Sequence, residues 1–264
     1  MVIAQRLSDE IEEKRIKISN EPEYFLKRSQ VMGAHLRRLC DIYSFWLEHP
    51  QERLKILRQH RAEDGTQLTN GDELRRKVTK GIKGIGEAWK YIRSHSNGKN
   101  LIQQINPTLI VQIGKLVDYN NIGYRRDRVT LNMEYTPPNP IKVPELIERF
   151  CEDIKRSDYS SVEAAATTHL RIAGIQPFDD GNKRTARLLQ DGILFDYGLP
   201  PAVIPAGERD VYHHLLGQGL VGLRDKDLKK QRPFYDFIGG KVNTALDLIL
   251  NDLKPSKGNG KRRY

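Results

Sequence analysis

One stretch of the sequence constrains the fold more than any other: residues 175–187, which read IQPFDDGNKRTAR. Gly181 and Asn182 are the residue types that most readily adopt a positive φ, and backbone N–H groups turned inward at such residues form an anion-binding nest. Apolar residues follow at helical spacing, namely Ala186, Leu189, Ile193 and Leu194. The sequence therefore predicts a nest at the N-terminus of a helix, where free N–H groups and the helix dipole favour phosphate.

Charged residues cluster around this predicted nest. Arg187 follows Lys183 by four positions and Arg184 by three, so the three cations lie together on the first turns of the helix. Cations are unfavourable at a helix N-terminus, and three of them there indicate that an anion binds. Asp180 lies just ahead, where its carboxylate could hold a divalent metal ion that bridges phosphates.

The stretch resembles the signature of the Fic family, His-x-Phe-x-(Asp/Glu)-Gly-Asn-Gly-Arg-x-x-Arg. The residues that match are Phe178, Asp180, Gly181, Asn182, Arg184 and Arg187. The chain differs at Gln176, where the family has its catalytic histidine, and at Lys183, where the family has a second glycine. The likeness covers about residues 100–250 and implies a mainly α-helical, Fic-like bundle with a small β-hairpin flap.

The resemblance also implies a reaction. Fic proteins transfer AMP, or another phosphate-containing group, to a hydroxyl side chain of a target protein, with ATP and Mg²⁺ as cofactors. Asp180 would hold the metal ion. The flap would lie at residues 129–135, where Val129, Thr130 and Leu131 would align the target protein by main-chain pairing. The phosphates would be held by five residues, Gly181, Asn182, Lys183, Arg184 and Arg187.

Gln176 bears on the predicted activity but not on the predicted fold. In the family, the histidine at this position takes the proton from the target hydroxyl, whereas an amide cannot be a general base near neutral pH. Losing a general base typically lowers the rate by ~10²–10⁴-fold, so AMP transfer is expected to be weak or absent. His169 is expected to be a core residue, and the adjacent His213 and His214 point in different directions, so none is predicted to replace it.

Two alternative functions remain open. Lys183 is shared with death-on-curing toxins, a branch of the superfamily that transfers phosphate, although these usually have alanine in place of Gly181. Gln176 favours instead a non-catalytic protein that binds a nucleotide or a partner. The family's self-inhibitory motif, (Ser/Thr)-x-x-x-Glu-(Gly/Asn), has no match; the nearest segment, residues 69–73, is followed by Leu74. Inhibition is therefore expected from a partner protein or from a different element.

Charge and composition bound the setting of the protein. The formal net charge of +10 permits binding to nucleic acid, but a solvated basic surface is the favoured interpretation. No apolar run approaches the ~20 residues needed to span a bilayer. The N-terminus has no signal-peptide core, and Cys40 and Cys151 have neither metal-ligand spacing nor the density of a disulfide scaffold. A cytoplasmic protein without a membrane partner is expected.

The predicted organisation has three parts. Residues 1–100 form a helical extension, residues 101–250 the Fic-like core, and residues 251–264 a basic, disordered tail. In the extension, apolar spacing predicts helices on both sides of Pro22 and a short helix at residues 54–57.

Local signals in the core predict where its helices begin and end. Asn106 and Pro107 are expected to cap and open one helix, since asparagine favours the N-cap and proline the first helical position. Ser160 and Glu163 have the spacing of a capping box at the start of the helix that leads to the 175–187 stretch. Gly174 is expected to end that helix.

Overall fold

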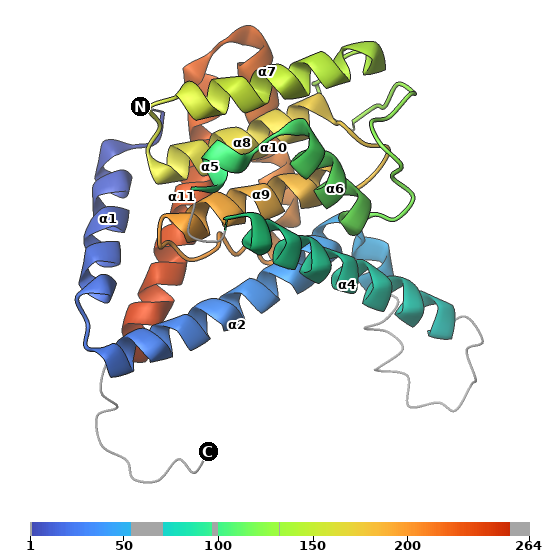
Figure 1. The fold of residues 1–264 in the computed structure, drawn as a ribbon. Coiled ribbons are helices and arrows are strands. Elements are labelled where there is room, and N and C mark those ends of the chain that lie inside the picture. Colours follow the sequence, from blue (N-terminus) through green and yellow to red (C-terminus); the bar gives the residue numbers. More distant parts are fainter. Residues whose placement is uncertain (1, 54–70, 97–99, 132, 254–264) are drawn as a thin grey trace.

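The structure, a computed structural model, describes residues 2–53, 71–96, 100–131 and 133–253 (Figure 1). Its α-helices are α1 (Gln5–Ser19), α2 (Glu23–Glu48), α4 (Gly71–Ser96), α5 (Leu101–Gln104), α6 (Pro107–Val117), α7 (Val143–Arg156), α8 (Ser161–Ile175), α9 (Asn182–Asp196), α10 (Arg209–Asp225) and α11 (Leu228–Leu253). The described part of the chain is thus mainly α-helical, as predicted. The expected helix at residues 54–57 and the tail from residue 254 lie outside the described residues, whereas residues 251–253 continue α11.

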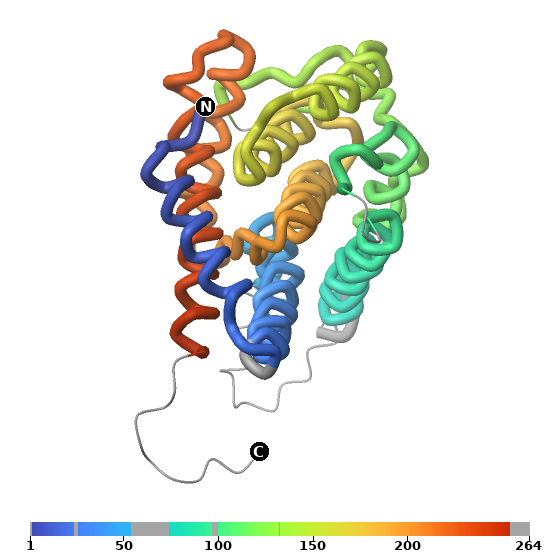
Figure 2. The backbone as a smooth tube through the Cα atoms, turned by 60° about the vertical axis from the view of Figure 1, so that its left-hand side comes forward, coloured from blue at the N-terminus to red at the C-terminus, as the bar shows by residue number. Residues whose placement is uncertain are grey.

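The helices surround a central pair, α8 and α9, which pack against each other. Nearly every residue of both helices is buried, including polar residues of α9 such as Arg184, Arg187 and Asp191. Figure 1 shows α7 on one side of this pair and α2 crossing on the other. Figure 2 shows α1 lying along α11, a pairing of the two ends of the described chain. The helices of the predicted extension therefore pack against the core that holds residues 175–187.

Local sequence signals set several helix ends. The Asn106 side chain accepts a hydrogen bond from the Leu109 N–H at 2.9 Å, with Pro107 in the first turn. The capping box of Ser160 and Glu163 is formed at the start of α8. These predictions are confirmed. In contrast, Gly174 does not end α8, which continues to Ile175.

Gly174 serves packing instead of helix termination. A Cβ at Gly174 would lie 3.1 Å from Leu220 Cδ2 and 3.3 Å from the Tyr135 hydroxyl, so the residue lets neighbouring segments approach α8. Gln176 takes the left-handed conformation that ends the helix, and its N–H donates to the Ile172 carbonyl. The sequence signal for a helix end was therefore assigned two residues too early.

The expected β-hairpin flap is not formed in the described residues. Residues 129–131 and 133–135 contain no strand, and Asn132 lies outside the described part. Side-chain contacts hold the region instead: the Arg125 guanidinium donates to the carbonyls of Asp127 and Pro138 at 2.7 and 2.6 Å. The prolines after residue 136 lack the N–H groups that a second strand would need, which is a physical reason for the missing hairpin.

Among the described helices, none has the length and apolar character that crossing a bilayer requires. Cys40 and Cys151 are both buried as free thiols, consistent with the absence of a disulfide pattern in the sequence.

Gly114 of α6 is predicted to be indispensable for packing. A Cβ at this position would lie 2.4 Å from the Phe178 ring, which anchors the loop before α9. Gly114→Ala should lower the free energy of unfolding by about 1–3 kcal/mol because the ring must move. Gly86→Ala is the control, since its Cβ would meet nothing within 4 Å, and it should raise stability by about 0.5–1 kcal/mol. Urea denaturation measures both; a shift of the same sign in both variants would contradict the packing.

Candidate active site

The loop between α8 and α9 joins two left-handed residues. Gln176 has a φ of 50° and Gly181 a φ of 80°. A Cβ at Gly181 would also lie 2.9 Å from Val117 Cγ1, so glycine is required there for both conformation and space. Asn182, the other residue expected at positive φ, is instead the first residue of α9. Of the two residues expected at positive φ, Gly181 alone adopts it.

Polar contacts hold this loop in place. The Asn182 amide accepts from the Phe178 N–H and donates to the Phe178 carbonyl, both at 2.8 Å. Asn121 donates to the Asp180 carbonyl at 2.9 Å, and Arg125 Nε donates to the Gln176 carbonyl at 2.6 Å. The contribution of Asn121 and Arg125 was missed in the sequence, because a side chain that binds a distant carbonyl leaves no pattern there.

Arg184 lies beneath the loop and is only 3% exposed. It pairs with Asp180 at 3.0 Å and Asp118 at 3.4 Å, and donates to the Val117 carbonyl at 3.2 Å. The guanidinium thus fixes the loop to the end of α6, and its Nε is a buried donor without a partner among the described residues.

Lys183 and Arg187 converge on one carboxylate, Glu48 at the end of α2. Lys183 Nζ lies 2.7 Å from Glu48 Oε2, and Arg187 Nη1 lies 3.0 Å from Glu48 Oε1. Burial by itself would raise the pKa of Glu48, but the charges of Arg187 and Lys183 outweigh it and lower that pKa to about 2. Glu48 is therefore ionised at neutral pH and occupies the cations that were predicted to hold phosphate.

The sequence contained a partial signal for Glu48. Ser44 and Glu48 have the spacing of the family's self-inhibitory motif, but His49 follows in place of glycine or asparagine. Arg187 donates to both Ser44 Oγ and the Ser44 carbonyl at 2.9 Å, so both motif positions contact the same guanidinium. A search for the full motif does not find this segment, because His49 stands at its last position. For that reason the sequence suggested inhibition by a partner protein or by a different element.

Neither Gln176 nor His169 is placed to act as a base. The Gln176 amide donates to the Ala173 carbonyl at 2.5 Å, and an amide does not titrate. His169 is fully buried between Gln190 and Tyr212, at 2.7 and 3.0 Å, and burial lowers its pKa to about 3. The prediction that His169 is a core residue is confirmed.

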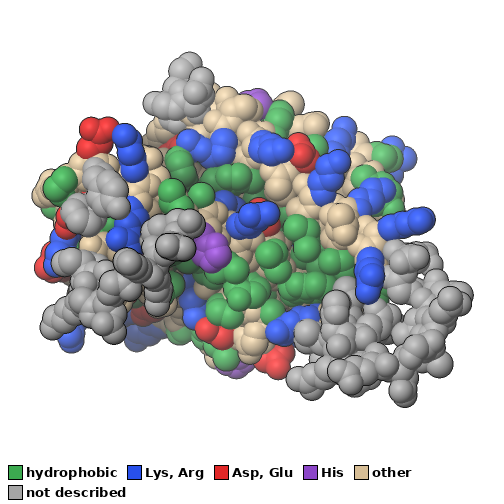
Figure 3. All heavy atoms as spheres, turned by 90° about the horizontal axis from the view of Figure 1, so that it is seen from below, with side chains coloured by type: hydrophobic (Ala, Val, Ile, Leu, Met, Phe, Trp, Pro, Cys, Tyr) green, Lys and Arg blue, Asp and Glu red, His purple; other side chains and the backbone are tan. Residues whose placement is uncertain are grey.

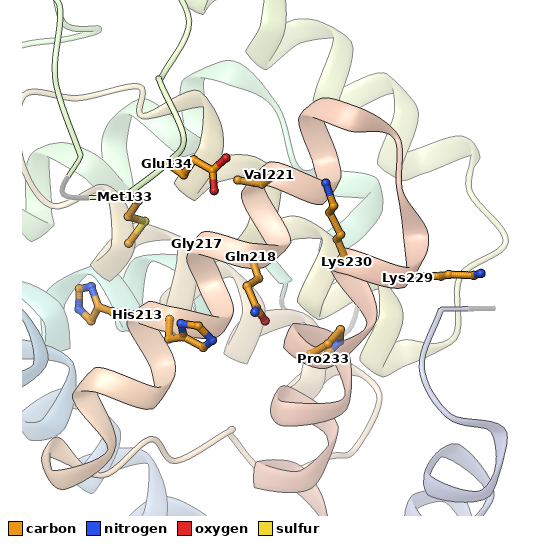
Figure 4. Close-up of a pocket in the computed structure, with 10 residues that line it drawn as sticks. Met133, Glu134, His213, Gly217, Gln218, Val221, Lys229, Lys230 and Pro233 are labelled. Carbon is orange, nitrogen blue, oxygen red and sulfur yellow. The ribbon is translucent and has the colours of Figure 1, made fainter.

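His213 borders a groove on the surface of α10. A cavity of about 630 Å³ lies between α10, the start of α11 and the segment before Tyr135, and Figure 4 shows the residues that line it, among them Met133, Glu134, His213, Gly217 and Lys230. Burial lowers the pKa of His213 to about 4, assisted by the charge of Lys183. His213 is thus the groove residue on which the charge of Lys183 acts.

Asp180 has the exposure that a metal ligand needs. Its side chain is 65% exposed; Oδ1 accepts from the Gly181 N–H at 2.5 Å and Oδ2 pairs with Arg184. No group of three metal-binding side chains occurs among the described residues. One exposed carboxylate nevertheless fits Mg²⁺, which is usually held by one or two carboxylates together with substrate phosphates and water.

The chain matches a known protein family over the region that contains the loop before α9. A family model described as the Fic/DOC family matches residues 97–194. The chain is 33% identical over 206 residues to the "Protein adenylyltransferase Fic" of Drosophila willistoni, covering 74% of this chain and 37% of that protein. It is 32% identical over 255 residues to that of Drosophila virilis, covering 91% and 48%. The chain thus spans less than half the length of these relatives.

Solved structures share the fold. The structure of Fic-1 from C. elegans matches with a TM-score of 0.66 and 20% identity, covering 94% of this chain and 72% of that one. A Fic domain containing signaling protein from Bacteroides thetaiotaomicron matches with a TM-score of 0.70 and 20% identity, covering 94% and 97%. At this identity the likeness concerns the fold.

Replacing Glu48 with glutamine should destabilise the fold, because it removes the two ion pairs of this carboxylate. Because the pKa of Glu48 is lower in the folded protein, its ion pairs stabilise the fold at pH values above its unfolded-state pKa near 4.5. This stabilisation is lost as the pH falls toward about 2. Glu48→Gln should therefore lower the free energy of unfolding by about 3 kcal/mol at pH 7, and by less at pH 3. Urea denaturation at both pH values measures this. Glu152→Gln, in an exposed pair, is the control; an equal loss in both variants would contradict the assignment.

Proposed function

The chain contains a Fic/DOC family domain, and on that premise we propose that it transfers AMP from ATP to a hydroxyl side chain of a target protein. The observation that carries the proposal is the convergence of Lys183 and Arg187 on one carboxylate at the N-terminus of α9. Two cations that meet at a helix N-terminus match the charge and hydrogen-bonding needs of a phosphate.

We further propose that Glu48 and the ATP phosphates compete for these cations. A carboxylate and a phosphate oxygen accept the same charge-assisted hydrogen bonds, so both cannot occupy Arg187 at once. ATP would have to displace the end of α2, and the protein would be held in a low-affinity state until α2 moves. This makes α2 an inhibitory element of the chain itself, so an inhibitory partner protein is not needed.

The metal ion and the remaining parts of ATP would bind around the same loop. Asp180 would hold Mg²⁺, and the bound ion would neutralise phosphate charge during transfer. The unpaired Nε of Arg184 would be within reach of a phosphate after the loop rearranges around the nucleotide. The groove beside His213 has a volume of about 630 Å³, within the usual range for a small-molecule site, and would take the nucleobase.

The target protein would bind along Val129, Thr130 and Leu131. In the described structure these residues have no strand partner, so their main chain is available to pair with an extended target segment. The flap would then become a strand only when the target supplies the second one. Nucleic acid has no role in this scheme.

Two alternatives rest on specific side chains. Lys183 brings an ammonium group to the position of the second glycine in the family signature and favours phosphate transfer. Gln176 donates to the Ala173 carbonyl and supplies no base, which favours a protein that binds a nucleotide without transferring any part of it. AMP and phosphate add different masses to a target, so mass spectrometry separates the three functions.

Restoring the missing base should raise activity. Histidine tolerates the left-handed conformation better than most residues, so Gln176→His should keep the φ of 50°. Made together with Glu48→Gln, so that α2 does not block ATP, it should raise AMP transfer about 10²-fold or more. Mass spectrometry of lysate proteins and of the protein itself after incubation with ATP and Mg²⁺ measures the transfer.

The control for this experiment is Arg184→Ala added to the same two changes, which should abolish the gain. Added mass corresponding to phosphate would support the phosphotransferase alternative. A variant that binds ATP but transfers neither group would support the non-catalytic alternative.

A further inference from the structure

One face of α4 carries exposed positive charge. Lys77 pairs with Glu52 at 2.9 Å, and from residue 74 to residue 86 the helix contains no acidic residue. The other exposed cations of this stretch are Arg75, Arg76, Lys80 and Lys83, and no ion pair joins them to a residue whose side chain the structure describes. Figure 3 views the molecule from below, the side on which α2 and α4 lie in Figure 1, and shows many Lys and Arg side chains (blue) on this surface.

Together with Thr79, these cations line one side of an open surface hollow along α4. Like charges on one helix face repel one another, and the repulsion is relieved when an anionic partner binds. We call the exposed side chains of Arg75, Arg76, Lys80 and Lys83 the α4 basic face.

The α4 basic face is continuous with the candidate active site. Lys80 Nζ lies 3.2 Å from the centre of the Tyr119 ring, a cation–π contact. Tyr119 stands between Asp118, which pairs with Arg184, and Asn121, which donates to the Asp180 carbonyl. One short loop therefore connects the basic face to the loop that precedes α9.

The same loop exposes apolar side chains. Tyr119 is 67% exposed and Ile122 is 78% exposed. Large apolar side chains beside a group of cations suit a partner that is both acidic and partly apolar. A protein segment has this mixed character.

We propose that the α4 basic face, with Tyr119 and Ile122, docks an acidic segment of the target protein beside the active site. The inference rests on the proposed function, since it names the class of target that the same site would modify. Docking would raise the local concentration of the target hydroxyl, and charge attraction would speed its association. Targets with acidic residues near the modified hydroxyl would be favoured.

A nucleic acid fits this surface less well. The basic residues from 75 to 83 span only about 12 Å of one helix, at 1.5 Å per residue. Beyond Tyr119 lie the exposed carboxylates of Asp179 and Asp180, which would repel an extended polyanion that continued toward the site. A polypeptide can place acidic residues on the basic face and neutral ones over the loop.

The test uses the full chain and a fluorescein-labelled peptide of about 12 residues, rich in Glu and Asp with one Leu and one Ser, followed by fluorescence anisotropy. The peptide should bind, and binding should weaken as the salt concentration rises, because the contacts are exposed charges. The double variant Lys80→Glu, Lys83→Glu should weaken binding about 10-fold or more. The control, Lys17→Glu with Arg149→Glu, makes the same change in net charge elsewhere on the exposed surface and should change binding by less than about 2-fold.

Each outcome decides the inference. Equal binding in the two double variants, or no binding to the unmodified chain, overturns it. A duplex oligonucleotide that binds more tightly than the peptide, with the same sensitivity to Lys80 and Lys83, overturns the assignment to a protein partner. Calorimetry with ATP on the same variants, each carrying Glu48→Gln so that α2 does not block the cations, keeps the two proposals apart, because Lys80 and Lys83 make no ion pair with the described residues around Glu48. Unchanged ATP binding with lost peptide binding supports docking; absent ATP binding in this background counts against the proposed function alone.

Discussion

The ion pairs of Glu48 with Lys183 and Arg187 connect the two halves of the structure. They join the end of α2 to the first turns of α9, across 139 positions of sequence. The Arg187 guanidinium is buried, and a buried charge without a partner destabilises a fold strongly. An anion that faces Arg187 therefore stabilises the fold. In the described structure that anion is Glu48, and in the proposed reaction it is a phosphate.

Arg187 is also one end of a buried polar network. Its Nη1 donates to the Tyr212 hydroxyl at 2.9 Å, and Tyr212 contacts His169, which contacts Gln190. The network continues through Asp191 to Arg37 of α2. Helix α2 is thus bound to α9 at two points, so its movement away from the site would break both. Burial lowers the pKa of His169 to about 3, so its ring is neutral near pH 7. The network therefore does not change with pH in the neutral range.

The sequence predicted what depends on neighbouring residues. The caps at Asn106 and Ser160 and the turn at Gly181 are set by contacts within a few positions, and all three are present. The resemblance of residues 175–187 to the family signature predicted the helical fold, and the spacing of Lys183, Arg184 and Arg187 predicted their cluster at one helix end.

Features that depend on distant residues could not be predicted in the same way. Arg125 holds the loop through the Gln176 carbonyl, a contact that depends on the backbone of a segment 51 residues away. The hairpin at residues 129–135 was expected from the family, but the described residues form no strand, since their main chain has no partner to pair with. Glu48 was missed because His49 interrupts the motif, while the ion pair depends on the carboxylate alone.

The central claim is that Glu48 and nucleotide phosphate compete for Arg187 and Lys183. Isothermal titration calorimetry of ATP with Mg²⁺, on the chain and on Glu48→Gln, tests it most directly. The claim predicts that ATP binds about 10-fold or more tightly to Glu48→Gln, because removing a competing charge frees both cations. Equal affinity for the two proteins, with Glu48→Gln folded, would contradict it.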